Sequence, residues 1–159
     1  MDIYERHAIE HECEKLINRY YHFANVDMGQ TVDLFATDGY LQWPSKKVGP
    51  GHEDMRTFLH RASKNMLDGV EVVMNTVSNI VIDVIDETSA KGVSYDTFWE
   101  HGYYDGDLQG RPAPITSPIG LQTWDDEFRL EHGEWKFQSR KMTFVFNNKF
   151  WKLQRVGRS

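Results

Sequence analysis

Two charged residues in the second half of the chain, Asp96 and Arg140, alternate with small, apolar and aromatic neighbours. Alternation of this kind is typical of strands, in which every second side chain points to the same face. Asp96 shares its face with Ser94 and Phe98, and Arg140 shares its face with Phe144. A carboxyl group among apolar side chains has a raised pKa and can transfer a proton near neutral pH. Asp96 could therefore act as an acid and Arg140 as an anion clamp. Alternatively, the two could form a structural ion pair.

Aromatic residues are the second group that could form a site, because rings commonly line small-molecule pockets. Five Trp, seven Tyr and nine Phe make up 13% of the 159 residues. Strand alternation places Gln122, Trp124 and Asp126 on one face. Trp135 and Phe137 have the opposite parity from Arg140, so we expect them to pack under a helix or against another subunit. The candidate substrate-binding residues are Tyr20, Trp43, Phe58, Phe98, Gln122, Trp124, Met142 and Phe144.

The composition argues against several classes of protein. Acidic residues outnumber basic ones by 24 to 18, a net charge of -6, so the chain lacks the basic surface typical of nucleic-acid binding. No apolar run reaches the roughly 18 residues of a membrane-spanning helix. The N-terminus is charged and lacks the apolar region of a signal peptide. The single cysteine, Cys13, cannot form an intramolecular disulfide, and a cytoplasmic location is expected.

Metal and cofactor motifs are not evident either. His7 and His11 have the i, i+4 spacing of a metal clip on a helix, but no third ligand is suggested, so a solvated helix face is the expected reading. The glycines form neither a dinucleotide-binding nor a phosphate-binding loop. We therefore expect no metal and no cofactor.

Periodicity predicts helices in the first half and long strands in the second, an α+β pattern. The expected helices span about residues 1–24, with Asp2 as N-cap, 30–36 and 52–63, and a turn at Thr37-Asp38-Gly39 precedes a short strand at 40–43. The long strands are expected at 70–85, with a bend near 75–79, and at 89–101, 119–130 and 134–147. A hairpin turn is expected at 131–133, and a loop rich in proline and glycine at 105–118. Residues 1–147 then form a single domain, followed by a basic and aromatic tail over 148–159.

Four segments of the chain follow one another in a characteristic order. They are Leu16-Ile17-Asn18-Arg19-Tyr20, then Leu34 to Gly39 with Trp43 following, then Thr76-Val77-Ser78-Asn79, and last Asp126-Glu127-Phe128-Arg129 with Gly133 to Phe137 and Arg140. The series extends over residues 9–146 and resembles the SnoaL-like proteins of the nuclear transport factor 2-like superfamily. The resemblance implies an α+β cone, in which about three N-terminal helices and a curved, mostly antiparallel sheet enclose a pocket. It also implies that the face of Asp96 and Arg140 is the concave one.

The resemblance places amides where some relatives carry a catalytic pair. Dehydratase and dehydrochlorinase members use an Asp–His pair, and the matching positions here are Asn25 and Asn75. Two amides can hold a carbonyl or hydroxyl group by hydrogen bonds, but they cannot act as the base. A different gap in the match puts Asp27 at the acidic position. The candidate catalytic residues are accordingly Asn25, Asp27, Asn75, Asp96 and Arg140.

Two classes of function remain open. The first is a cofactor-independent lyase, isomerase or cyclase that acts on a mid-sized apolar polyketide, terpenoid or ring compound. The second is a protein without catalysis, which either binds such a ligand or serves as an accessory subunit with its cone filled by its own side chains. In both cases the expected partners are a small molecule and further copies of the chain, because related folds bury the outer face of the sheet in dimers or trimers.

Overall fold

The computed structural model of the chain describes residues 1–68, 71–102, 104, 108–115 and 117–148. Its helical segments are α1 (Ile3–Ala24), the 3-10 helix η1 (Met28–Leu34), α2 (His52–Ala62) and α3 (Lys64–Leu67). Its strands are β1 (Phe35–Trp43), β2 (Lys46–Val48), β3 (Glu71–Val84), β4 (Ser89–Gly102), β5 (Gly120–Glu131) and β6 (Glu134–Asn147). Helices followed by long strands confirm the α+β class. The predicted tail lies almost wholly outside the described residues.

The first helix forms for reasons that are visible in the sequence. The Asp2 carboxylate accepts a hydrogen bond from the backbone N–H of Glu5 at 2.8 Å, and the Glu5 carboxylate accepts one from the backbone N–H of Asp2 at 2.7 Å. This reciprocal capping box satisfies backbone donors that a helix start otherwise leaves without partners. The predicted apolar stripe is buried, and within it Cys13 and Ile17 have no exposed surface. Packing of this stripe stabilises the helix more than its propensity does.

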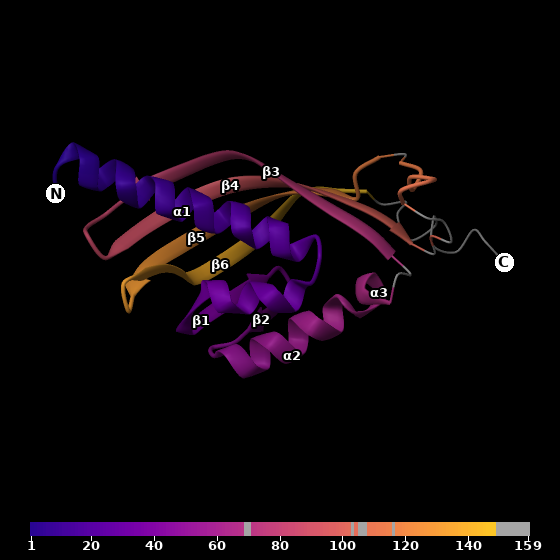
Figure 1. Cartoon of the computed structure of the whole chain (residues 1–159), viewed down its shortest axis with the longest axis horizontal. Coiled ribbons are helices and arrows are strands. Elements are labelled where there is room, and N and C mark those ends of the chain that lie inside the picture. Colours follow the sequence, from indigo (N-terminus) through magenta and orange to yellow (C-terminus); the bar gives the residue numbers. More distant parts are fainter. Residues whose placement is uncertain (69–70, 103, 105–107, 116, 149–159) are drawn as a thin grey trace.

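The six strands form one sheet in the order β2-β1-β6-β5-β4-β3. Only the β1–β6 pair is parallel, so the sheet is mostly antiparallel, as predicted. The predicted β5–β6 hairpin turn contains His132 and Gly133, both with positive φ, the geometry of a tight two-residue turn. Figure 1 shows the long strands curving together, with α1 along one face, α2 below β1 and β2, and α3 following α2. The predicted bend in β3 is also present, because its register against β4 shifts between Ser78 and Val81.

The segment after α1 differs from the prediction. The predicted helix over 30–36 is the 3-10 helix η1, which is equally long but begins and ends two residues earlier, and Val32 and Phe35 are buried as expected. The turn predicted at 37–39 is wrong, because these residues lie inside β1. The strand pairs irregularly with β6 at this point, and a Cβ atom on Gly39 would lie 2.8 Å from the carbonyl oxygen of Phe137. Glycine is required here for close approach of two backbones rather than for a turn.

Two short elements, β2 and α3, are not predicted by the sequence pattern.

The parity predicted for Phe137 is wrong, because β6 contains a bulge. The register against β5 pairs Glu127 with Ser139 but Phe128 with Phe137, which leaves Gln138 as an extra residue. One inserted residue reverses the alternation of a strand. Phe137 therefore faces the concave side with no exposed surface. It packs under a helix there, as expected, since its ring lies 5.9 Å from that of Tyr20 on α1 and 5.2 Å from that of Phe128.

Candidate functional site

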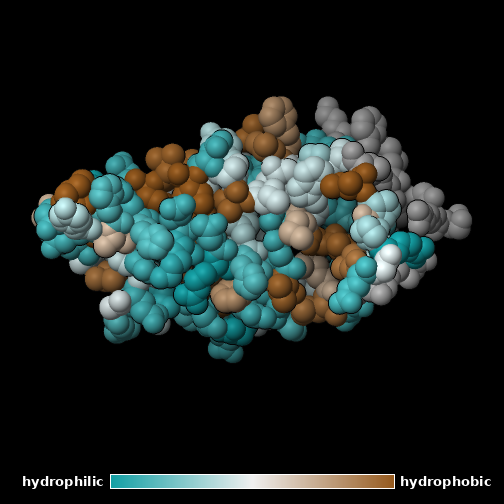
Figure 2. All heavy atoms as spheres, turned by 45° about the horizontal axis from the view of Figure 1, so that its top comes forward, coloured by the Kyte–Doolittle hydropathy of each residue, from teal (hydrophilic) through white to brown (hydrophobic). Residues whose placement is uncertain are grey.

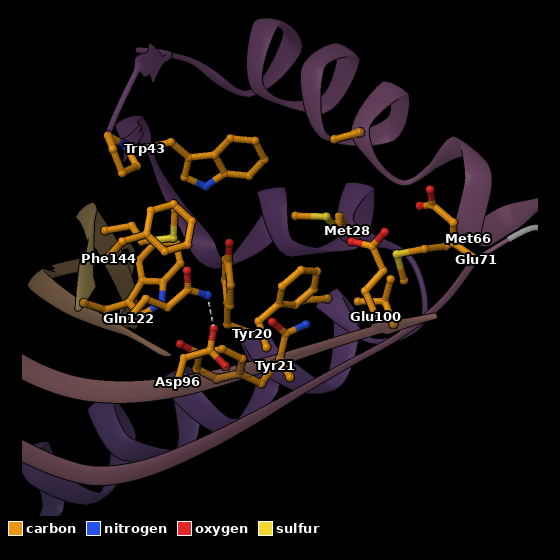
Figure 3. A pocket seen from close by; sticks show the side chains of 18 of the residues that line it. Tyr20, Tyr21, Met28, Trp43, Met66, Glu71, Asp96, Glu100, Gln122 and Phe144 are labelled. Carbon is orange, nitrogen blue, oxygen red and sulfur yellow. Dashed lines mark hydrogen bonds between the residues drawn. The ribbon is translucent and has the colours of Figure 1, made fainter. Parts of the chain in front are cut away.

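A cavity of about 420 Å³ lies between the concave face of the sheet and the helices, and its size is within the range of small-molecule pockets. Predicted residues on its wall are Tyr20, Trp43, Asn75, Asp96, Phe98, Gln122, Trp124, Met142 and Phe144. The other lining residues are Tyr21, Ala24, Met28, Pro44, Ser45, Ala62, Met66, Glu71, Val73 and Glu100. Figure 3 shows Asp96 and Gln122 on one side of the central Tyr20 ring, and Glu71, Glu100, Met28 and Met66 together on the other.

Asp96 is a buried carboxyl group on the wall of this cavity. It is only 1% exposed, because β4 is a central strand and its concave face lies beneath the helices. One carboxylate oxygen, Oδ2, accepts a hydrogen bond from the Gln122 side-chain amide on the neighbouring strand β5. The other oxygen, Oδ1, has no partner among the described residues. Burial raises the pKa of Asp96 to about 6, and the Gln122 hydrogen bond and the positive charge of Arg140 oppose that rise.

Arg140 forms its ion pair with Asp126, not with Asp96. Its Nε and Nη2 atoms donate to the two Asp126 oxygens at 2.8 and 3.1 Å, and neither side chain has exposed surface. Burial by itself lowers the pKa of Arg140, but the Asp126 carboxylate together with the Tyr21 and Tyr20 side chains outweighs this effect, so the pKa lies above its ordinary value. Arg140 therefore keeps its charge, and it is not among the described residues that line the cavity. The sequence placed Asp126 on the correct face but did not identify it as the partner.

The Arg140 guanidinium is enclosed by aromatic rings. Its central carbon lies 4.1 Å from the ring centre of Tyr20, 4.5 Å from that of Phe137 and 4.6 Å from that of Trp124. Cations are attracted to ring faces, so the rings stabilise the charge as well as shield it from water. Tyr20 stands between Arg140 and the cavity, because its side chain lines the cavity and its ring also packs against the Arg140 guanidinium. The ion pair is thus part of the wall's support and not of its inner surface.

Two further polar groups on the wall are hydrogen-bond donors. The Tyr21 hydroxyl is buried and has no partner within the described part of the chain, and the Trp124 indole nitrogen is buried near the Asp96 carboxylate, whose pKa it lowers. Burial raises the pKa of Tyr21 well above its ordinary value, so its hydroxyl keeps its proton at neutral pH. Most buried polar groups in proteins have a partner, so a buried donor without one calls for an explanation such as a water molecule, an ion or a catalytic role. The wall therefore offers hydrogen bonds in an otherwise apolar setting.

The two amides at the predicted catalytic positions bind each other. The Asn25 side-chain oxygen accepts from the Asn75 backbone N–H at 2.7 Å and from its side-chain amide at 2.9 Å. In return, the Asn25 amide donates to the Asn75 backbone oxygen at 3.0 Å. These bonds attach the end of α1 to β3. Only Asn75 reaches the wall, and Asn25 lies behind it.

Two other predicted site residues, Asp27 and Phe58, stabilise neighbouring elements and do not line the cavity. The Asp27 carboxylate caps η1 by accepting from the Gly29 backbone N–H at 2.9 Å, and Asp27 is not on the described wall. Phe58 of α2 packs edge-on against the wall residue Trp43, with ring centres 5.1 Å apart, and does not line the cavity itself. In both cases residue type was a poor guide, because Asp is common both at helix caps and in catalytic sites, and Phe is common both in a core and on a cavity wall.

Sequence reasoning missed Tyr21, Glu71 and Glu100. Glu100 continues the alternation of Asp96 and Phe98 by one more step on β4, so this position could have been found by extending the count. Glu71 alternates in the same way with Val73 and Asn75 on β3. Tyr21 gave no such signal, because it adjoins Tyr20 and the predicted stripe contained only one of them. It faces the cavity where the helix meets the concave sheet.

No group of three or more His, Cys, Asp or Glu residues within the described ranges is arranged to hold a metal ion. The described helices likewise include none with the length and apolar character required to cross a membrane.

The chain is similar to several solved structures. A candidate scytalone dehydratase from Novosphingobium aromaticivorans is 18% identical, with a TM-score of 0.69 over 91% of this chain and 89% of that one. A type 2 hexachlorocyclohexane dehydrochlorinase, LinA, is 12% identical, with a TM-score of 0.70 over 92% of each chain. A protein of unknown function from Mycobacterium tuberculosis is 16% identical, with a TM-score of 0.71 over 94% of this chain and 80% of that one. At such identities these similarities show the fold alone.

No curated protein sequence matches the chain. The family model of the SnoaL-like domain, in contrast, matches residues 5–141, which include both the helices and the long strands of the cone. With the match extending over most of its 159 residues, the chain belongs to the SnoaL-like domain family.

Proposed function

We propose that the protein is a lyase, isomerase or cyclase that transfers a proton by means of its own side chains on a mid-sized, largely apolar ring compound. One observation carries this proposal: Asp96 is a buried carboxyl group on the wall of an aromatic cavity, with a pKa of about 6 and one oxygen without a partner in the described structure. A carboxyl group with this pKa is mostly ionised at pH 7 and is basic enough to accept a proton.

The remaining wall groups suit the same chemistry. Asp96 would take a proton from a carbon atom beside a carbonyl group, and the electron pair of the broken C–H bond would move onto the carbonyl oxygen. The Tyr21 hydroxyl and the Trp124 indole N–H are donors that can stabilise such an oxygen, because they are already desolvated. Gln122 fixes the Asp96 carboxylate by its hydrogen bond. Return of the proton to another carbon isomerises the compound, and loss of a leaving group completes an elimination.

The test is proton exchange on a neutral two-ring ketone, 2-tetralone, in deuterated water. Wild-type protein should exchange the protons beside the carbonyl faster than buffer, with a rate that rises through about pH 6, the pKa of Asp96. Asp96→Asn should lose roughly a hundredfold or more, the usual contribution of general base catalysis. Asp83→Asn, an exposed carboxylate on β3, is the matched control and should leave the rate unchanged. Exchange at the wild-type rate in Asp96→Asn would contradict the proposal.

A second candidate function is binding without catalysis, and the Asn25–Asn75 pair favours it. Asn25 and Asn75, which match the positions of the Asp–His pair in some relatives, use their amides to hydrogen-bond each other, and an amide cannot transfer a proton. The same experiment separates the two candidates. If 2-tetralone raises the melting temperature of the protein while its protons exchange at the buffer rate, the protein binds ring compounds without acting on them.

We also propose that the chain is a homo-oligomer joined through the outer face of its sheet. Met74, Val81, Val93 and Tyr95 all lie on this face, opposite to the cavity, and each is at least 37% exposed. Figure 2 shows hydrophobic side chains in several patches between hydrophilic ones on the displayed side of the molecule. Light scattering after gel filtration should give a dimer or trimer, and Val93→Lys should shift it towards the monomer. A monomeric wild-type protein would contradict this part of the proposal.

A further inference from the structure

Four buried polar atoms near the cavity have no hydrogen-bond partner among the described residues. They are the hydroxyl oxygens of Ser94 and Tyr21, the Oδ1 atom of Asp96 and the Nη1 atom of Arg140. Ser94 and Arg140 have no exposed surface, and Asp96 and Tyr21 are 1% and 4% exposed. Because a buried polar atom without a partner is costly, four of them in one region call for a molecule that bonds to them.

The strands and α1 bring these four groups together. Ser94 and Asp96 are successive residues on the concave face of β4, and Trp124 of β5 lies opposite Ser94. The central carbon of the Arg140 guanidinium lies 4.6 Å from the ring centre of Trp124 and 5.3 Å from that of Tyr21. The charges of Arg140 and Asp96 both act on the pKa of Tyr21, so its hydroxyl is within range of both. Figure 3 shows Tyr21 and Asp96 in the lower part of the cavity.

The hydrogen-bonding character of the four atoms fits water. The Arg140 nitrogen only donates, the ionised Asp96 oxygen only accepts, and the two hydroxyls do both. A water molecule also does both, and a buried water typically makes about three hydrogen bonds. A ligand in the cavity does not reach all four atoms, because neither Ser94 nor Arg140 is on the described wall. A carboxylate oxygen has two lone pairs, so Oδ1 can bond to water and still accept a proton from the cavity.

We propose that an internal water molecule lies behind the cavity wall, bonded to Ser94, Tyr21, Asp96 and Arg140, and that Ser94 is a positioning residue that acts through this water on the Asp96 carboxylate. The water donates to Oδ1 and thereby favours the ionised form of Asp96, against the effect of burial. The water site itself does not depend on the proposed function, but its role in holding the base ready rests on it.

The first test detects the water itself. Oxygen-17 magnetic relaxation dispersion on the full chain without ligand measures water molecules that stay inside a protein. Ser94→Val replaces the hydroxyl by a methyl group and should remove about one such water relative to the wild type. Ser139→Ala is the matched control, because Ser139 is also fully buried but donates to Glu127 at 2.9 Å, and it should leave the number unchanged.

The second test follows the charge of Asp96 by carbon-13 NMR of its carboxyl group. Ser94→Val should raise the pKa of Asp96 above its value of about 6 by roughly half a unit or more. Ser94→Thr has the same shape as the valine variant but retains a hydroxyl, and it should restore most of the wild-type value. Tyr21→Phe should raise the pKa as well, and Ser139→Ala should not change it.

The Ser94 variants leave every other titratable group near Asp96 in place. Those groups are Tyr20 and Tyr21 on α1, Asp126 on β5, Arg140 on β6, and Glu71 and Glu100 on the same cavity wall. A shift in the Asp96 pKa between the valine and threonine variants therefore reports the hydroxyl alone.

Two results would overturn the inference: as many long-lived waters in Ser94→Val as in the wild type, or the same Asp96 pKa in the valine and threonine variants. If the larger side chains prevent folding, Ser94→Ala adds no atoms and gives both comparisons against the wild type. Neither measurement needs a ligand, so their failure is separate from that of the 2-tetralone assay, which tests the proposed function.

Discussion

Asp96 and Arg140 are both charged and both buried, but their surroundings give them different roles. Arg140 has a paired carboxylate and is enclosed by aromatic rings, which stabilise its charge inside the protein, although its Nη1 atom has no hydrogen-bond partner among the described residues. Asp96 has one hydrogen bond from a neutral amide, so burial dominates and its pKa rises to about 6. A group that exchanges its proton near neutral pH is suited to chemistry, whereas a fixed charge is suited to support.

The raised pKa of Asp96 makes a prediction about stability. The folded protein holds this proton more tightly than the unfolded chain, whose pKa is near 3.8, so Asp96 contributes most stability below pH 4 and loses it as the pH rises through about 6. The free energy of unfolding of the wild type relative to Asp96→Asn should therefore fall by about 2 kcal/mol between pH 4 and pH 7. Urea denaturation at several pH values measures it. A difference that stays constant with pH would contradict the assignment, and Asp83→Asn should show no such trend.

The Arg140–Asp126 pair makes a second prediction. Arg140→Met leaves the Asp126 carboxylate buried without its partner, which should destabilise the fold by about 3 to 5 kcal/mol. The double variant Arg140→Met/Asp126→Leu removes both charges and should recover most of this loss. Lys141→Met is the control, since its amine lies 3.7 Å from Glu127 at the surface and should change stability by less than about 1 kcal/mol. A double variant as unstable as the single one would show that the pair is required for the fold itself.

At the scale of elements, the cavity depends on how α1 is held over the sheet. Its N-terminus is fixed by the capping box, and its C-terminus is attached to β3 by the hydrogen bonds between Asn25 and Asn75. Between these ends, the buried stripe brings Tyr20 and Tyr21 to the cavity. The amides that resemble a catalytic pair by position thus act as a clamp between two elements.

The capping box can be tested alone. Asp2→Ala removes the side-chain acceptor for the Glu5 backbone N–H and should lower the free energy of unfolding by about 1 kcal/mol. For a chain of this length that corresponds to about 2 to 4 °C in melting temperature. Asp2→Ser keeps an acceptor at the same place and should retain most of the stability. Equal losses in the two variants would mean that the cap does not act through this hydrogen bond.

At the scale of the molecule, the cavity exists because a curved sheet cannot be filled completely by the helices on its concave face. The central strands β4, β5 and β6 are each paired on both sides, whereas β2 and β3 are the edges. The buried charges and the ring cluster all lie on these central strands and on α1. Rigid support therefore lies beneath the Asp96 side of the cavity, whereas the edge strand β3 supplies Glu71 and Val73 at the other side.

This arrangement predicts an uneven exchange of backbone protons. Amides of β5 and β6 around Asp126 and Arg140 should exchange most slowly, because they open only with global unfolding. Amides of the three-residue edge strand β2 should exchange fastest among the strands. Hydrogen exchange followed by NMR measures both. Protection of β2 as high as that of β5 would mean that the edge is covered by something else, such as another subunit.

The sequence by itself determined what depends on local repetition. The stripe of α1, the four long strands and the face that Asp96 shares with Ser94 and Phe98 follow from periods of about 3.6 and 2 residues. That this face is the concave one was implied by the resemblance to the SnoaL-like proteins. Such periods can be recognised from neighbouring residues alone, without knowing which residues distant in the sequence are in contact. For the same reason most of the aromatic wall could be predicted, since alternation continues along each strand until something interrupts it.

Only the tertiary structure decided what depends on interruptions and on partners distant in the sequence. The bulge at Gln138 reversed the face of Phe137, and it leaves no mark in the composition of β6. Arg140 could pair with Asp96 or Asp126 by parity alone, and the register of β5 against β6 places Asp126 directly opposite it. The Asn25–Asn75 clamp and the neighbouring Glu71 and Glu100 were fixed in the same way. Each joins two segments whose distance is set by packing, and packing is a property of the whole chain.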